Sequence, residues 1–220
     1  AESSSQVDLF WEGDDFFNSV IADLDSANVS ICLESYIFHS DHTGERVIQS
    51  LLAAARRGVR IRELVDGVGS FPLWNLRRYF RNSTAAFRVF KPVGLFSAFK
   101  SGFHRRDHRK LVLVDDRIAY TGGMNIGDEL SLEVRGNRRW RDNMMRVEGG
   151  DFWLLQQSFD ELWTYAGKKS FGLMPRSKIS RRYLGSLSPF DPGCPDIFYL
   201  SNHSRVLRRR QRHVLVQLIK

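Results

Sequence analysis

A histidine, a lysine and an asparagine stand close together in residues 108–125, which read HRKLVLVDDRIAYTGGMN. His108 and Lys110 are two positions apart, so on a strand their side chains point to the same face. The pair Gly122-Gly123 lets the backbone approach whatever occupies that face, and Asn125 adds an amide. An imidazole can attack or carry protons, while an ammonium and an amide neutralise charge on phosphoryl oxygens. The segment therefore predicts a site for chemistry on a phosphoryl group.

Each of these residues has an ordinary structural explanation when it is taken alone. A surface histidine is usually solvated, a lysine in a basic stretch usually faces water, and two glycines after a strand usually form a turn. The combined pattern H-x-K-x4-D-x6-G-G-x-N, in which Asp115 supplies the aspartate, is an improbable coincidence. We interpret the pattern as catalytic.

The strands and helices around this segment can be predicted from the spacing of apolar residues, which alternates between two patterns along the chain. Short apolar runs are typical of strands, and apolar residues that recur every three or four positions are typical of helices. Strands are predicted at residues 6–11, 28–38, 59–66, 86–91, 111–115, 117–121 and 143–147, and helices around the apolar stripes of residues 16–24, 47–55 and 152–162. Asp115-Asp116 predicts a tight turn, and Thr43 and Gly58 are the predicted ends of the second helix. The alternation of strands and helices indicates an α/β fold.

The charge of the chain is unevenly distributed. The 220 residues carry 33 basic and 25 acidic side chains, a net charge of +8, and 42% are hydrophobic. These values are typical of a globular chain and exclude disordered, collagen-like and disulfide-framework proteins. The basic excess lies in residues 77–110, with 10 basic side chains and one acidic, and in residues 176–220, with 10 and 2. Both stretches are expected to attract nucleic acid, phospholipid headgroups or a small phosphate ester.

Aromatic side chains accompany the first basic stretch, at Phe71, Trp74, Phe80, Phe96, Phe99 and Phe103. Some of them are expected in the core. The rest would suit a membrane interface, where rings lie at headgroup depth and cations contact anionic lipid. Aromatic side chains beside basic residues also suit single-stranded nucleic acid.

Metal and disulfide sites are not expected. Cys32 and Cys194 are far apart and show no ligand spacing. His104 and His108 have the H-x-x-x-H spacing of a helical metal site, but the segment lacks a third ligand and a general-base glutamate, and a strand is expected there. His39 and His42 lie in a polar turn and are expected to be solvated. No run of about 18 apolar residues, the length of a transmembrane helix, is present.

The motif also carries a family resemblance. His108, Lys110 and Asp115, followed by Gly122-Gly123 and Asn125, match the HKD motif of the phospholipase D superfamily. The stretches LESYIF, LLAAARRGVRIRELVDGVGS and WRDNMMRVEGG resemble the first half of bacterial cardiolipin synthases, and the resemblance covers residues 6–165. It implies a phospholipase D-like fold, with a mixed β-sheet flanked by helices on both faces and one HKD half. It also implies chemistry that needs no metal or other cofactor.

The resemblance implies roles for the motif residues. His108 would attack a phosphodiester phosphorus and form a phosphohistidine intermediate. Lys110 and Asn125 would hold the non-bridging oxygens, and Asp115 would support the site structurally. Arg109 and Gly122-Gly123 are candidate substrate-binding residues.

Asp142, in WRDNMMRV, resembles the acidic residue that hydrogen-bonds the second nitrogen of the nucleophilic imidazole. Such a bond would fix the tautomer of His108. Alternatively, Asp142 pairs with Arg139 or Arg141 at the surface.

One feature departs from the family: a complete site needs two HKD motifs, and this chain has one. His203 and His213 are not followed by the required lysine. A strand-like run at residues 196–200 and a helix-like run at 204–220 repeat the order of residues 6–26. We therefore expect a first domain at residues 1–166, a linker at 167–195 and the start of a second, incomplete repeat at 196–220. The alternative is a single-motif chain that completes its site as a homodimer.

The leading hypothesis is a phosphatidyltransferase of cardiolipin synthase type, with phosphatidylglycerol as donor and acceptor. Its partners would be phospholipids, an anionic membrane surface and the second HKD half, and nucleic acid is not expected. The enzyme would be peripheral to the bacterial membrane. Two rivals remain open, a phospholipase D or nuclease that transfers to water, and an inactive module that binds anionic membrane.

Overall fold

The computed structural model describes residues 5–93 and 106–168, and in these residues seven strands form one mixed sheet. The strands are β1 (Gln6–Phe10), β2 (Ser30–Ser35), β3 (Arg60–Asp66), β4 (Ala86–Phe90), β5 (Leu111–Val114), β6 (Ile118–Gly122) and β7 (Met144–Glu148). Their order is β1-β7-β6-β5-β2-β3-β4. β2, β3 and β4 run parallel, and the other neighbours pair antiparallel.

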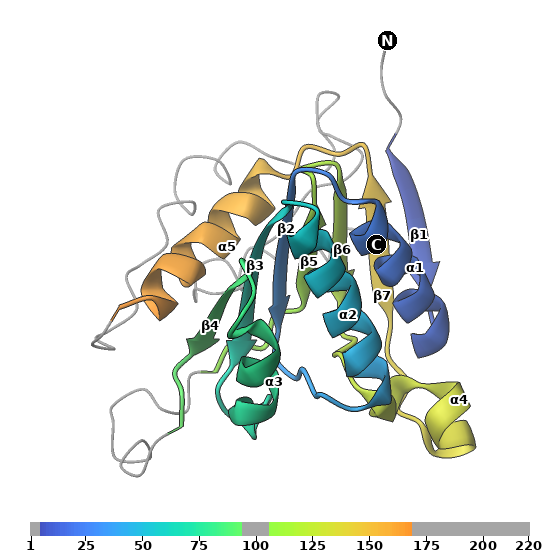
Figure 1. Ribbon diagram of the computed structural model, residues 1–220. Helices are drawn as coiled ribbons and strands as arrows, with labels where there is room; N and C mark the ends of the chain where they lie inside the picture. The colour runs from blue at the N-terminus through green and yellow to red at the C-terminus, as the bar shows by residue number, and fades with distance from the viewer. Residues whose placement is uncertain (1–4, 94–105, 169–220) are drawn as a thin grey trace, which may run out of the picture.

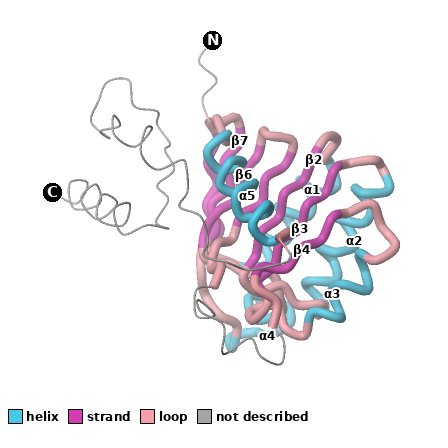
Figure 2. The backbone as a smooth tube through the Cα atoms, turned by 90° about the vertical axis from the view of Figure 1, so that its left-hand side faces the viewer, coloured by secondary structure: helices cyan, strands magenta, loops and turns pink. Residues whose placement is uncertain are grey.

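Helices cover both faces of the sheet (Figures 1 and 2). One face carries α1 (Gly13–Ser26), α2 (His42–Arg56) and α3 (Leu73–Phe80), and the other carries α5 (Trp153–Ala166). The short α4 (Leu132–Arg135) lies between 3-10 turns at Asp128–Leu130 and Gly136–Arg138. The predicted α/β fold, a mixed sheet with helices on both faces, is confirmed.

Side chains alternate between two cores along the central strands. Leu33 and Val112 pack with α1, α2 and α3, while Cys32 and Leu113, one position along, pack with α5. This period of two is what a sheet buried on both faces requires. Each such buried aliphatic side chain stabilises the fold by about 1.5–3 kcal/mol.

The beginning of α2 differs from its prediction. Asp41, and not Thr43, is the N-cap: its Oδ1 accepts from the backbone N–H of Gly44 at 3.0 Å. Its Oδ2 also accepts from the N–H of Asp128 at 2.8 Å, so the two carboxylate oxygens join the start of α2 to the turn at Asp128–Leu130. The end of α2 is as predicted, because Gly58 adopts a φ of 89° just after the helix.

The topology gathers several loops at one end of the sheet. We call this end the site edge, defined as the end at which β2, β3 and β6 end and β5 and β7 begin; it is the lower end in Figure 1. The opposite end carries the β5–β6 turn, where Asp115 and Asp116 both have a φ of 53° and form the predicted tight turn. None of the described helices has the length and apolar character needed to cross a membrane.

Candidate active site

His108 and Lys110 lie at the site edge, immediately before β5. Both project on the side of α1 to α3, since Val112, two positions further, packs in that core. His108 is exposed, whereas Lys110 is only 4% exposed. Nζ of Lys110 lies 3.2 Å from Nδ1 of His108 and donates to the His108 backbone oxygen at 2.8 Å. The two groups that the spacing predicted on one face are therefore in contact.

Tyr36, in the loop after β2, forms the wall behind this pair. Its ring centroid lies 4.7 Å from that of His108, and Nζ of Lys110 lies 5.2 Å from the Tyr36 ring. An aromatic face attracts an ammonium and restricts its position. Tyr36 was missed by the sequence reasoning, although it is the fourth residue of the LESYIF stretch.

The surroundings lower the pKa of both Lys110 and His108. Burial lowers the pKa of Lys110 to about 8, and the charges of Asp107 and Asp142 oppose this shift. Burial and the Lys110 charge lower the pKa of His108, against the same two carboxylates. At neutral pH the imidazole is therefore uncharged and keeps a lone pair, while the lysine is still mostly an ammonium. A nucleophile and a cation are thus available together.

Asp142 lies close enough to act on both groups electrostatically, but its recorded hydrogen bond is local. Its Oδ1 accepts from the N–H of Asn143 at 2.8 Å. The alternative predicted for it, pairing with neighbouring arginines, is not what the described residues show. Arg139 and Arg141 both contact Glu12 instead, at 2.7 and 3.3 Å. The hydrogen bond from His108 to Asp142 stays a prediction.

The two glycines make room for protein atoms. A Cβ on Gly123 would lie 1.9 Å from Oδ1 of Asp142, and one on Gly122 would lie 2.5 Å from the backbone oxygen of Asn143. Only glycine permits this approach of β6 to the chain before β7. The pair thus places the Asp142 carboxylate near the site, and its predicted contact with substrate remains untested.

Asn125 is held in the loop that follows Gly122-Gly123. Its Oδ1 accepts from the N–H of Ile37 at 3.2 Å, and Ile126 donates its N–H to the Ile37 oxygen at 3.0 Å. The amide oxygen is therefore engaged with the backbone after β2. Because an asparagine carries two further N–H donors, the side chain can still hold an anionic oxygen.

Asp115 lies at the other end of β5 from Lys110. The four residues of β5 lie between the two, which are therefore about 16 Å apart along the strand. The Asp115 carboxylate accepts from the N–H groups of Asn28, Val29 and Ser30, each at 2.8 Å. Burial acts to raise its pKa, but these three bonds and the charge of Arg117 lower it. Its position is structural: it joins the β5–β6 turn to the start of β2.

Arg109 projects to the opposite face from its two neighbours. Nε lies 2.5 Å from Oε1 of Glu34 and 3.4 Å from Oδ1 of Asp107, and Nη1 donates to Ser158 Oγ on α5. This guanidinium ties β5 to β2 and α5. The substrate-binding role predicted for Arg109 stays a prediction. The sequence signal for its partner Glu34 was a glutamate directly after the apolar residues 31–33 of β2.

A family model described as "Cardiolipin synthase, PLD-like domain" matches residues 20–163. The chain belongs to this family. Cardiolipin synthase 1 of Bacillus anthracis is 35% identical over 169 residues, which are 76% of this chain and 33% of that protein. A cardiolipin synthase of Geobacillus kaustophilus is 36% identical over 166 residues, 74% of this chain and 32% of that protein. The chain spans about a third of the length of the curated relatives it matches.

Solved structures share the fold of this PLD-like domain. NucT from Helicobacter pylori superposes with a TM-score of 0.57 at 18% identity, covering 73% of this chain and 97% of that one. Nuc of Salmonella typhimurium, a phospholipase D family member, gives 0.55 at 20% identity, with 74% and 94% covered. These likenesses show the phospholipase D-like fold.

A second polar group of the PLD-like domain lies beside the site, in the loop between β2 and α2. His39 Nδ1 lies 3.6 Å from Glu129 and 4.0 Å from Asp41. The hydrogen bond to Glu129 raises the pKa of His39 although burial acts against it. His39 is therefore paired with Glu129, and its side chain remains partly solvated, as expected, at 39% exposure. Three such groups within 4.8 Å could hold a cation, but both Asp41 oxygens already accept backbone N–H groups.

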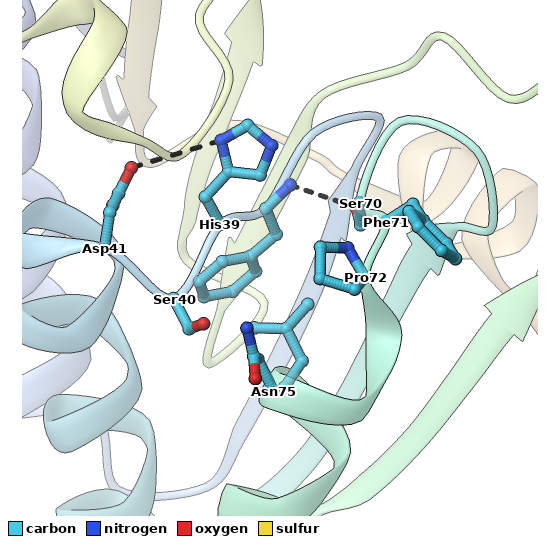
Figure 3. A pocket seen from close by; sticks show the side chains of 9 residues that line it. His39, Ser40, Asp41, Ser70, Phe71, Pro72 and Asn75 are labelled. Atoms are coloured by element: carbon cyan, nitrogen blue, oxygen red, sulfur yellow. Dashed lines mark hydrogen bonds and ion pairs between the residues drawn. The ribbon is translucent and has the colours of Figure 1, made fainter.

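A shallow pocket opens next to His39 (Figure 3). It has a volume of about 290 Å³ and is lined by Phe38, His39, Ser40, Asp41, Ser70, Phe71, Pro72, Asn75 and Leu76. Ser70 fixes its floor, because its Oγ donates to the Tyr36 oxygen at 3.1 Å and accepts from the N–H of Phe38 at 3.0 Å. Ser70 thus connects the pocket to Tyr36, whose ring contacts His108.

Proposed function

We propose that His108 is the nucleophile of a phosphatidyl transfer reaction. A nitrogen of the imidazole attacks the phosphorus of a phospholipid, so that a P–N bond forms and the P–O bond to the departing alcohol breaks. That oxygen takes up a proton. A primary hydroxyl of a second glycerophospholipid then loses its proton and attacks the same phosphorus, and the P–N bond breaks. With phosphatidylglycerol as donor and acceptor, the products are cardiolipin and glycerol.

The observation that carries this proposal is the exposed imidazole of His108, whose Nδ1 lies 3.2 Å from Nζ of Lys110. Lys110 and the amide hydrogens of Asn125 would hold the non-bridging oxygens, where negative charge builds up during transfer. Asp142 would orient the imidazole and stabilise its positive charge. No metal or other cofactor is required by this scheme.

The departing oxygen needs a proton donor that this motif does not supply. We propose that the histidine of a second HKD motif provides it, either in the same parent chain or in a second copy of this one. The expected linker at residues 167–195 and repeat at 196–220 fall almost wholly outside the described residues. The sequence that follows Lys220 in the parent gene tests the first arrangement: it requires a second H-x-K-x4-D.

The direct test uses the parent enzyme and vesicles of phosphatidylglycerol, with lipid products separated by mass spectrometry. We expect cardiolipin from the wild type and none from His108→Ala. His42→Ala removes another exposed histidine, outside the motif, and should leave the product unchanged. Absence of cardiolipin from the wild type would refute the synthase proposal.

The same assay separates the rival reactions. Phosphatidic acid as the main product would assign a phospholipase D, and cleavage of added DNA would assign a nuclease, provided that His108→Ala abolishes either activity. The 220-residue chain alone is expected to turn over little unless it dimerises. Turnover by a chain that sediments as a monomer would contradict the need for two motifs.

The proposed substrates also imply a location. An enzyme that takes phosphatidylglycerol from a bilayer works at its surface, so we propose that the PLD-like domain is peripheral to the bacterial membrane. Fractionation of cells that produce the parent enzyme tests this: the active protein should sediment with membranes.

A further inference from the structure

Two exposed apolar surfaces flank the site edge, and each is accompanied by arginines. The α3 patch consists of Phe71, Trp74, Arg77, Arg78 and Arg81, and the α4 patch consists of Leu132, Val134, Arg135, Arg138 and Trp140. Most large apolar side chains of the described residues are buried, so the exposed tryptophans at this edge, Trp74 and Trp140 in the patches and Trp11 after β1, call for an explanation.

The α3 patch is one face of a helix. Its tryptophan and arginines stand at positions i, i+3, i+4 and i+7, which form a single stripe, while Leu76 and Phe80 bury the opposite side of α3. Trp74 is 67% exposed and Phe71 is 58% exposed, and their rings meet edge to face at 6.3 Å. The sequence predicted an interfacial role for aromatics here, and the structure separates the two exposed rings from buried Phe80.

The α4 patch is similar in composition. Leu132, Val134 and Trp140 are 44%, 41% and 59% exposed. Trp140 is fixed by its backbone, which donates to the Glu129 oxygen at 2.6 Å. Burial of these side chains in an apolar medium would be favourable, since nothing in the described chain covers them.

Basic side chains exceed acidic ones at the α3 patch only. There, Glu45 accepts from Tyr79 at 2.6 Å and lies close to Arg78, so one carboxylate stands against three arginines. At the α4 patch, Glu133 is exposed, Asp14 accepts from the N–H groups of Leu132 and Glu133, and Glu129 interacts with the charge of Arg135. The α3 patch is therefore complementary to an anionic partner, whereas the α4 patch contributes mainly its apolar side chains.

Both patches are physically connected to the reaction centre. Gly69, just before the α3 patch, packs so closely on Tyr36 that a Cβ would lie 2.2 Å from the Tyr36 oxygen, and Tyr36 contacts His108. Trp140 precedes Asp142 by two residues. Figure 1 shows α3 and α4 at the same end of the sheet, the end that carries the site.

We propose that the α3 and α4 patches dock the chain on an anionic phospholipid membrane, with the site edge facing the headgroups. This inference rests on the proposed function, because it identifies the surface from which His108 would take its substrate. Tryptophan rings favour the headgroup region, and arginines bind lipid phosphates. The exposed apolar side chains favour a membrane as the partner. A soluble phosphate ester could be bound by the arginines alone. Because the α3 and α4 patches would both contact the membrane, they would also restrict the tilt of the site edge relative to the membrane surface.

The test is flotation of the 220-residue chain with vesicles of phosphatidylglycerol and phosphatidylcholine, compared with phosphatidylcholine alone. We expect strong binding only to the anionic vesicles, weakened by salt. Trp74→Ala and Trp140→Ala should each lower the partition coefficient several-fold. Arg77→Gln should lower the partition coefficient by a factor of about five, which is the typical contribution of one arginine at an anionic membrane surface.

Matched controls lie at the opposite end of the sheet. Trp153→Ala changes a tryptophan that is 43% exposed at the start of α5, and Arg117→Gln changes an exposed arginine beside the β5–β6 turn. Both controls should float like the wild type. Circular dichroism confirms that each variant is folded before it is compared.

Three results would overturn the proposal: equal binding to neutral vesicles, equal losses in the controls and the patch variants, or displacement of the vesicles by a single-stranded oligonucleotide that binds more tightly. The last result would assign the patches to nucleic acid. His108→Ala should float normally, so that this surface and the proposed chemistry can fail separately.

Discussion

Lys110 is bound to His108 twice: its ammonium lies 3.2 Å from Nδ1 of the imidazole and donates to the backbone oxygen of the same residue at 2.8 Å. The contact presents a fixed cation beside the imidazole without protonating it. Because Lys110 is buried and its pKa is lowered to about 8, the cation itself titrates close to physiological pH. The chemistry of the site therefore depends on pH through the lysine as well as through the histidine.

The first prediction concerns the alkaline limb of the pH profile. Transfer by the parent enzyme should decline as pH rises through about 8, because deprotonated Lys110 no longer neutralises phosphoryl oxygens. Lys110→Arg should move this decline to higher pH, since a guanidinium stays charged. Lys110→Gln should lower kcat/KM by about 100-fold to 1000-fold. An unchanged alkaline limb in Lys110→Arg would assign the titration to another group.

The second prediction tests the structural role of Arg109. Arg109→Gln leaves Glu34, which is 1% exposed, without its charge partner, and should destabilise the chain by about 3–5 kcal/mol. Burial and the neighbouring Asp107 raise the pKa of Glu34, against the effect of Arg109. The double variant Arg109→Gln/Glu34→Gln should recover much of the loss in urea unfolding. If Arg109 bound substrate instead, Arg109→Gln would raise KM and leave unfolding unchanged.

The third prediction concerns Asp115, whose three backbone hydrogen bonds hold the far end of β5. Asp115→Ala should cost about 2–4 kcal/mol of unfolding free energy. Because the pKa of Asp115 is lowered in the folded state, its contribution is present above the unfolded pKa and lost as pH falls through the folded one. Asp116→Asn in the same turn is the control and should change little. Equal unfolding curves for Asp115→Ala and the wild type at pH 7 would refute this role.

The fourth prediction concerns Glu63 on β3, which is 0% exposed and whose two carboxyl oxygens have no partner among the described residues. Burial raises the pKa of this carboxyl well above its usual range. A raised folded pKa means that stability is greatest below the unfolded pKa and falls as pH rises towards the folded one. Glu63→Met, of similar shape, should therefore stabilise the chain at pH 7 by about 1–3 kcal/mol.

The control for Glu63 is Glu133→Met, which changes an exposed glutamate and should have little effect. The gain from Glu63→Met should shrink when unfolding is measured near pH 3, where the glutamate is protonated in both states. A variant that is less stable than the wild type at pH 7 would show that the Glu63 carboxyl has a function that compensates for its burial.

Much of the fold and the centre of the site could be predicted from local sequence patterns. The period of two placed His108 and Lys110 on one face, because alternation along a strand needs no knowledge of its neighbours. The same pattern could not say what Arg109 would meet on the other face. Its partners Glu34 and Ser158 are 75 and 49 residues away in the chain. Asp115 was recognised as part of a motif, but its three partners belong to the start of β2.

The residue types of the site, their relative faces and the alternation of strands and helices could all be predicted from local patterns, since these depend on backbone geometry within a few residues. Which segments meet could be seen only in the folded chain. The tertiary structure selected Asp41 over Thr43 as the cap of α2, directed Arg139 and Arg141 to Glu12 instead of Asp142, and left Phe71 and Trp74 exposed while Phe80 was buried. Such choices depend on strand order and helix orientation, which bring together side chains that no local pattern relates.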